Sequence, residues 1–183
     1  MHKALKAAQR LADGIRLVFN WVYIGLIFCS KFLIVALVAV TSTHVFMRYV
    51  LGGGLRWAEE VALILVIWFT FIAMALGVKK NLHISINVLP KRMPQWLDTG
   101  LFKLKALVIF IVAFVMVYYG RDLFRAGMRS TLPATGMPAG IQHLAIPVAG
   151  VLMLYDSFMD LCGFDKKDRY IDEHVFRDEE EDV

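Results

Sequence analysis

The sequence has little of what most enzymes and small secreted domains require. It contains two cysteines in 183 residues, and only 20% of its residues are charged. Two cysteines are too few for a disulfide framework or a zinc site. The sequence also lacks a nucleophile elbow, a phosphate-binding glycine loop and a catalytic cluster of His with carboxylates. These absences argue against an enzyme, and no cofactor is expected.

The sequence also has no internal repeat and no pair of interrupted apolar segments, the pattern from which transporters build substrate sites. Nor does it show a cleavable signal peptide, because the first apolar block is too long for one and no small-x-small site follows it. That block is expected to be a retained span. Cys29 and Cys162 are expected on the reducing, cytoplasmic side as small apolar fillers.

What the sequence does have is apolar residues, which make up 58% of the chain and gather in long blocks. About 20 consecutive apolar residues are enough for one helix to cross a bilayer. The blocks predict an all-α integral membrane protein with four transmembrane helices, at about 21–47, 61–78, 104–120 and 141–159. Pro147 lies inside the fourth block and predicts a kink there.

The polar flanks complete the expected domain organisation. Residues 1–20 predict an amphipathic helix in the headgroup layer, with a frayed terminal tail as the alternative. Residues 21–160 form the four-helix domain, and 161–183 form a charged cytoplasmic tail. The alternation of polar and apolar residues from Lys79 to Pro90 predicts a short amphipathic segment on the inner face, between the second and third spans.

The distribution of cations predicts the orientation. Fourteen of the 20 Lys and Arg residues flank one side, in the N-terminus, the middle loop and the C-terminus, and five flank the other. Cytoplasmic loops carry the excess of Lys and Arg. Both termini are therefore expected in the cytoplasm, with segments 48–60 and 121–140 outside.

Expected interface or lipid anchors are Lys3, Lys6, Arg10, Trp21, Lys31, Lys79, Lys80, Lys103 and Lys105. Lys31 lies within the first span, where snorkelling and an ion pair with another helix or a partner both remain open.

The first outer segment runs from Arg48-Tyr49 through three glycines to Arg56-Trp57-Ala58-Glu59-Glu60. Its glycines allow a tight reversal, and carboxylates suit the positive end of the second span. Alternatively, Arg48, Arg56, Glu59 and Glu60 form an ion-pair cluster that braces the helix ends and meets a partner.

The second outer segment, 121–140, is too rich in Pro and Gly for one long helix. Its three arginines could dock an acidic surface of a periplasmic partner, or could be ordinary loop polarity. They are Arg121, Arg125 and Arg129.

Two further patterns leave alternatives open. His44 and His143 lie at matching outer depths, where they could ligate a haem, although an interhelical hydrogen bond is the simpler interpretation. Asp156 and Asp160 lie one turn apart near the inner end of the fourth span. They could relay protons, but a position near water at the helix end is the simpler interpretation.

Taken together, four spans with the strings Arg48-Tyr49, Trp57-x-Glu59-Glu60 and His83-Ile84-x-Ile86 resemble the small (Q) membrane subunit of TRAP (tripartite ATP-independent periplasmic) transporters. The resemblance covers roughly residues 20–160. It implies that these motif residues, His83 included, contact a partner or brace helices. Asn87 stands where the family usually has Asp, so any ion pair at that site is put in doubt.

The resemblance implies a non-translocating scaffold in the bacterial inner membrane. Its partners would be a large elevator-type membrane subunit, in a heterodimer, and a periplasmic protein that captures an organic acid; membrane lipids surround it, and no nucleic acid is expected. Transport would be secondary and sodium-driven symport. The alternatives are a haem-binding electron-transfer subunit and a scaffold for another membrane complex.

Overall fold

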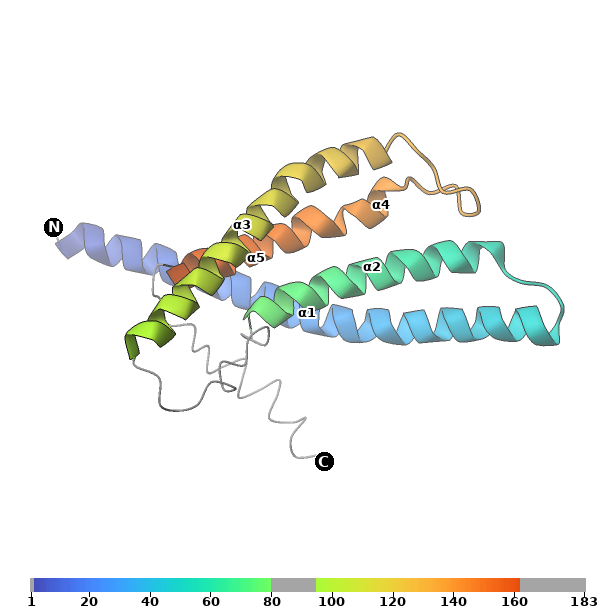
Figure 1. Ribbon diagram of the computed structural model, residues 1–183, viewed down its shortest axis with the longest axis horizontal. Helices are drawn as coiled ribbons and strands as arrows, with labels where there is room; N and C mark the ends of the chain where they lie inside the picture. Colours follow the sequence, from blue (N-terminus) through green and yellow to red (C-terminus); the bar gives the residue numbers. More distant parts are fainter. Residues whose placement is uncertain (1, 80–94, 162–183) are drawn as a thin grey trace, which may run out of the picture. The chain divides into compact units, whose positions relative to one another are not determined.

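The computed structural model describes residues 2–79 and 95–161, with side chains described for residues 19–79, 100–101 and 103–161. The described backbone is helical apart from the connecting loops (Figure 1). Its helices are α1 (His2–Val50), α2 (Arg56–Lys79), α3 (Gln95–Gly127), the short α4 (Gly140–His143) and α5 (Ala145–Leu161).

The chain divides into two compact units, one of residues 1–29 and 167–183 and the other of residues 30–166. In the first unit, α1 is helical from His2 onward, without a break before Trp21. Trp21 is 73% exposed, whereas Tyr23 and Ile27 are buried. Cys29 is an exposed thiol, so it is not the buried filler expected from the sequence. The expected position of residues 1–20 in the headgroup layer stays a prediction.

Four helical stretches are long and apolar enough to cross a membrane, which confirms the four predicted spans by length and composition. They are Phe19–Val50, Arg56–Lys79, Lys103–Gly127 and Gly140–Leu161, the last formed by α4 and α5 together. The first three run past the predicted ends because the helical backbone continues beyond the apolar block into polar residues. The difference is largest at α3, which continues through Gly127 rather than ending near Gly120.

The connection between α1 and α2 is a five-residue loop, 51–55. The amide N–H groups of Leu51 and Gly53 both donate to the Met47 carbonyl, at 3.2 Å each, and so satisfy the last turn of α1. Gly52 lies between them with φ of 68°, a left-handed conformation that glycine adopts without steric cost. The predicted glycine reversal is therefore confirmed at this residue.

The most extensive helix packing in the second unit is that of α3 against α5. On α3 a row of small buried residues repeats every seventh position, and its members are Ala106, Ala113, Gly120 and Gly127. A seven-residue spacing returns to nearly the same helix face, so the row forms one seam. A Cβ added at Gly127 would lie 2.9 Å from the backbone of Gly140, and one added at Gly150 would lie 3.2 Å from the carbonyl of Ala113. Small residues thus let these backbones approach closely, as in other membrane helix pairs.

The fourth span is interrupted at Leu144, between α4 and α5. The break lies one turn before Pro147, which has no N–H to donate to the His143 carbonyl and whose ring crowds that carbonyl. The Leu144 N–H still donates to Gly140, at 2.9 Å, and the Val148 N–H donates to Leu144, at 3.3 Å. Leu144 itself keeps helical dihedrals, with φ of −62° and ψ of −27°, so the predicted kink at Pro147 stays a prediction.

The C-terminal part of α5 and the N-terminal part of α3 contain buried charged residues. Asp156 and Asp160 on α5 are 2% and 7% exposed, so they do not face water as the sequence suggested. Lys105 of α3 is also buried, at 8% exposed. The one-turn spacing of the two aspartates points both into the helix-packed side of α5, because residues four apart share a helix face. The bundle therefore encloses charges of both signs.

Candidate functional site

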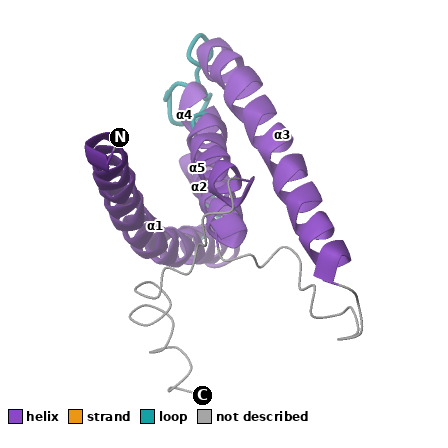
Figure 2. Ribbon diagram, turned by 90° about the vertical axis from the view of Figure 1, so that its left-hand side faces the viewer, coloured by secondary structure: helices purple, strands orange, loops and turns teal. Residues whose placement is uncertain are grey.

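The two loops described within the second unit, 51–55 and 128–139, come together at one end of it, which we call the loop end. Residues 128–139 connect α3 to α4 and are called the hairpin loop (teal in Figure 2). The sequence motifs Arg48-Tyr49 and Trp57-x-Glu59-Glu60 lie at this same end, on the last turn of α1 and the first turns of α2.

The hairpin loop is held by its own backbone hydrogen bonds. The Leu132 N–H donates to Met137 at 2.8 Å, the Ala139 N–H donates to Ser130 at 2.9 Å, and Thr131 pairs with Pro138 in an isolated antiparallel bridge. At its tip, Gly136 adopts φ of 69°, which its missing Cβ permits. The loop is therefore a defined structure between α3 and α4.

Glu60 of α2 binds the tip of the hairpin loop through both carboxylate oxygens. Its Oε1 accepts from the Ala134 N–H at 2.8 Å, and its Oε2 accepts from the Thr135 N–H at 2.8 Å and the Thr135 hydroxyl at 2.7 Å. Hydrogen bonds to a charged acceptor are the stronger class. Glu60 is thus the link between α2 and the α3–α4 connection.

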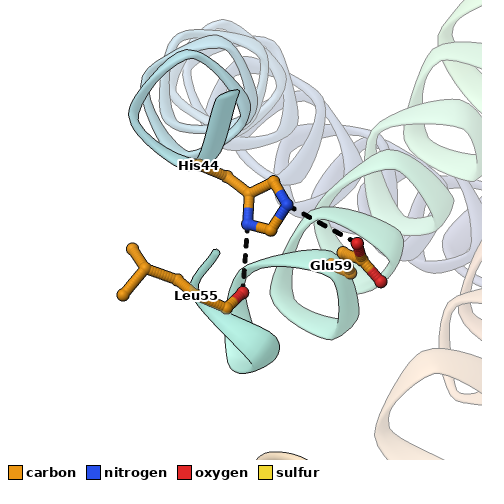
Figure 3. Close-up of polar contacts among 3 residues, drawn as sticks. All are labelled: His44, Leu55 and Glu59. Atoms are coloured by element: carbon orange, nitrogen blue, oxygen red, sulfur yellow. Dashed lines mark hydrogen bonds and ion pairs between the residues drawn. The ribbon is translucent and has the colours of Figure 1, made fainter. Parts of the chain in front are cut away.

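His44 links α1 to the start of α2 (Figure 3). Its Nδ1 lies 3.0 Å from the Leu55 carbonyl oxygen, and its Nε2 lies 3.5 Å from Oε1 of Glu59. A carbonyl oxygen only accepts, so Nδ1 carries the proton in this contact. The Nε2 contact becomes an ion pair when that nitrogen is protonated too. Glu59 and Glu60 therefore brace two different elements, and among the described residues neither forms an ion pair with Arg48 or Arg56, which was the alternative considered for this segment.

A groove of about 1010 Å³ opens at the loop end between these braces. Arg48, Arg56, Trp57 and Glu59 contribute to its lining, and the hairpin loop contributes Pro133 and Ala134. The Arg48 guanidinium lies 5.9 Å from the centre of the Tyr49 ring. In the described part of the chain, neither Arg48 nor Arg56 forms an ion pair, and both are exposed.

The three arginines predicted to dock a partner have different backbone settings. Arg121 and Arg125 lie on the last turns of α3, which corrects their expected place in a loop, and Arg129 lies in the hairpin loop. The α3 helix persists there because no Pro or Gly occurs between Gly120 and Gly127. All three are exposed, and Arg121 is 3.7 Å from the Asp122 carboxylate and stacks near Tyr118.

The remaining predicted residues lie away from the loop end or outside the description. Lys103 and Lys31 are exposed, and Lys79 is half-buried at the end of α2. The burial of Lys105 differs from the expected headgroup anchor. Lys80, His83 and Asn87 lie outside the described residues, as do the side chains of Lys3, Lys6 and Arg10.

The contacts of His44 argue against the alternative in which it ligates a haem. Both of its ring nitrogens face oxygen atoms of the protein, so neither is directed at a free axial position. The Cδ2 atom of His143 lies 2.7 Å from where a Cβ on Gly127 would be, which places that ring against α3. Among the described side chains, no three His, Cys, Asp or Glu residues converge on a metal site.

Sequence reasoning missed Ala134, Thr135 and Leu55, which supply the partners of Glu60 and His44. Ala134 and Leu55 contribute only backbone groups, which carry no sequence signal, whereas Thr135 contributes its hydroxyl as well as its N–H. The one available signal is Thr135 in a Pro-Ala-Thr-Gly string, because such a string favours a turn with exposed N–H groups.

Comparison with known proteins places this chain among transport proteins. A family model described as "Tripartite ATP-independent periplasmic transporters, DctQ component" matches residues 37–164. A TRAP transporter small permease protein of Haemophilus influenzae is 25% identical over 127 residues, which are 67% of this chain and 79% of that protein.

Two further relatives are longer than the region they share with this chain. The C4-dicarboxylate TRAP transporter small permease protein DctQ of Rhodobacter capsulatus is 30% identical over 133 residues, 70% of this chain and 56% of the relative. The sialic acid TRAP transporter permease protein SiaT of Haemophilus influenzae is 23% identical over 123 residues, 67% of this chain but 20% of the relative. The family match covers most of the chain, including every element of the loop end, and the chain therefore belongs to the DctQ component family of TRAP transporters.

Proposed function

We propose that this chain is a non-translocating scaffold subunit of a sodium-driven TRAP transporter for organic acids. Small subunits of the family work with a large membrane subunit and a substrate-binding protein. Here the large subunit would perform the elevator motion, and this chain would form a heterodimer with it in the bacterial inner membrane. Both termini would lie in the cytoplasm, so the loop end would face the periplasm.

The single observation that carries the scaffold role is the bracing of all the described helix connections at the loop end. Glu60 ties α2 to the hairpin loop, and His44 ties α1 to α2. The helix interruption at Leu144 keeps the backbone hydrogen bonds on either side of it. Substrate sites in transporters use unwound backbone with free N–H and C=O groups. The braced end instead suits a rigid body that resists motion in its partner.

The large subunit would pack on exposed apolar faces of α1 and α3. These faces include Val38, Val45 and Phe46 on α1 and Ile111 and Val115 on α3, all of them largely exposed. Membrane helices associate through close packing as readily as they face lipid. These apolar side chains would give the partner a broad contact surface, and the hydroxyl of the neighbouring Thr41 is already bonded to the Leu37 carbonyl of its own helix.

The periplasmic substrate-binding protein would dock on the exposed arginines Arg121, Arg125 and Arg129. The Glu60 hydrogen bonds hold the hairpin loop, and with it Arg129, in one position relative to α2. Fixed positive groups would steer an acidic surface of the partner and set its register. Organic acids are the proposed substrate class because two relatives are named for C4-dicarboxylate and sialic acid.

Calorimetry and co-purification test the proposal together. The purified full-length chain should give no saturable heat with succinate or sialic acid, because the carboxylate site would lie in the large subunit. Clear one-to-one binding would contradict the passive role. Tagged chain expressed with its genomic neighbours should retain a large multi-span partner, and stable retention of an unrelated membrane complex instead would favour a scaffold of another kind.

A further inference from the structure

The groove at the loop end is lined by charges of both signs that are not matched to each other. Arg48 and Arg56 form no ion pair within the described part of the chain. Of the two carboxylates, Glu60 is occupied by three hydrogen bonds from the hairpin loop. Glu59 is 72% exposed, and one of its oxygens lies 3.5 Å from His44. Two guanidinium groups and one accessible carboxylate are therefore available to a ligand.

This arrangement disfavours a ligand that carries only negative charges. Two guanidinium groups suit a phosphodiester, because their planar forks bind phosphate oxygens in pairs. A purely acidic ligand, such as a run of partner carboxylates, would also meet the Glu59 carboxylate and be repelled. A zwitterion avoids that repulsion, since its phosphate can meet the arginines while its ammonium group meets Glu59.

The position of the groove indicates where such a zwitterion comes from. The groove lies at the ends of two helices long and apolar enough to span a membrane, Phe19–Val50 and Arg56–Lys79. Trp57 contributes to its lining, and Tyr49, which follows the lining residue Arg48 in sequence, is 78% exposed. Exposed aromatic residues at span ends mark the depth of the headgroups. The volume of about 1010 Å³ is ample for a headgroup.

We propose that this groove binds the headgroup of a phosphatidylethanolamine molecule, with Arg48 and Arg56 on the phosphate and Glu59 on the ammonium group. The inference needs only the membrane position of the helix ends, and it does not depend on the proposed docking of a periplasmic protein. A bound lipid would fill the space between α1, α2 and the hairpin loop.

Native mass spectrometry of the detergent-purified full chain tests this proposal, with defined lipids added in turn. Phosphatidylethanolamine should bind with higher affinity than phosphatidylglycerol, which has no ammonium group. The double variant R48Q/R56Q should weaken phosphatidylethanolamine binding about tenfold or more, as expected for the loss of hydrogen bonds between charged groups. The control R121Q/R125Q removes two exposed arginines outside the groove lining and should bind like the unchanged chain.

Two further measurements test the role of Glu59 and the contribution of the acyl chains. Glu59→Gln retains both arginines and should abolish the preference for phosphatidylethanolamine over phosphatidylglycerol. Soluble glycerophosphoethanolamine should compete weakly, because it has the headgroup but no acyl chains. Equal binding of phosphatidylethanolamine by R48Q/R56Q and R121Q/R125Q would overturn the proposal, as would an unchanged preference in the Glu59 variant. Competition by glycerophosphoethanolamine at the affinity of the lipid would assign the site to a soluble phosphodiester instead.

Discussion

Glu60 on α2 accepts two of its three hydrogen bonds from Thr135, a residue 75 positions later in the chain. With the third bond, from the Ala134 N–H, the carboxylate closes the tip of the hairpin loop. This side chain thereby joins the first and second halves of the four-span domain. The Trp68 indole N–H joins the same halves nearer the middle of α2, where it donates to the Ile141 carbonyl at 3.1 Å.

Replacing Glu60 with Gln should loosen the tip of the hairpin loop. An amide has one acceptor oxygen, and its NH2 group would face backbone N–H donors. Hydrogen exchange at Ala134 and Thr135 should accelerate roughly tenfold, as loss of a hydrogen bond to a charged group predicts. Glu59→Gln is the matched control, because no described loop N–H donates to Glu59. Equal protection of the loop in both variants would show that Glu60 does not hold it.

The Thr135 hydroxyl should contribute mainly through Glu60, because its other contact, from the Met137 N–H, is long at 3.5 Å. Thr135→Val removes the 2.7 Å hydroxyl bond and keeps the backbone N–H and nearly the same shape. Its effect on exchange at Ala134 should be smaller than that of Glu60→Gln, and the double variant should be no worse than Glu60→Gln alone. Such non-additivity is the signature of two residues in one interaction. Additive effects would separate the two side chains.

The α3–α4 crossing should tolerate no Cβ at Gly127. A methyl group there would approach the Cα and N of Gly140 to 2.9 Å, and backbone cannot move aside as a flexible side chain can. Gly127→Ala should lower the free energy of unfolding by about 1–3 kcal/mol, the usual cost of overpacking. Gly100→Ala on the same helix has nothing within 4 Å of the added Cβ and should be neutral or stabilising. Unfolding in detergent, followed by circular dichroism, would compare them, and equal stability would reject the close approach.

His44 should hold the end of α1 to the start of α2. His44→Phe removes both ring-nitrogen contacts and should cost roughly 0.5–1.5 kcal/mol per hydrogen bond lost. Thr43→Val is the control, because its hydroxyl bonds only to the Ala39 carbonyl within the same helix. Nitrogen NMR of the labelled ring gives an independent readout: the proton should reside on Nδ1 in the neutral ring. A proton on Nε2 alone would contradict the Leu55 contact.

The sequence predicted the helices well because a membrane span is a long, uniform signal. Four apolar blocks corresponded to four helical stretches, and Pro147 marked the interrupted one. The ends were less predictable, because hydropathy marks where apolar residues stop, whereas a helix continues until a breaker. At α3 that breaker is Gly127, so Arg121 and Arg125 lie on the helix.

The loop-end contacts were predictable only in part. The position of Glu59 and Glu60 at the start of α2 follows from the affinity of carboxylates for a helix N-terminus. The partners of these carboxylates and of His44 could not be predicted in the same way. Leu55 and Ala134 contribute backbone groups, and Thr135 is separated from Glu60 in the sequence by two membrane spans. The burial of Asp156 and Asp160 was missed for a related reason: position near a span end does not indicate which face of α5 packs against α3.

Substrate uptake by vesicles that contain this chain, its large subunit and the periplasmic binding protein tests the central claim most directly. The variant R121E/R125E/R129E should lower the initial rate about tenfold or more when the binding protein is limiting, because like charges across an interface cost several kcal/mol. Excess binding protein should restore the rate, and R121K/R125K/R129K should retain most of it. An unchanged rate in the charge-reversed complex at every concentration of binding protein, with the large subunit still bound, would contradict the proposed docking.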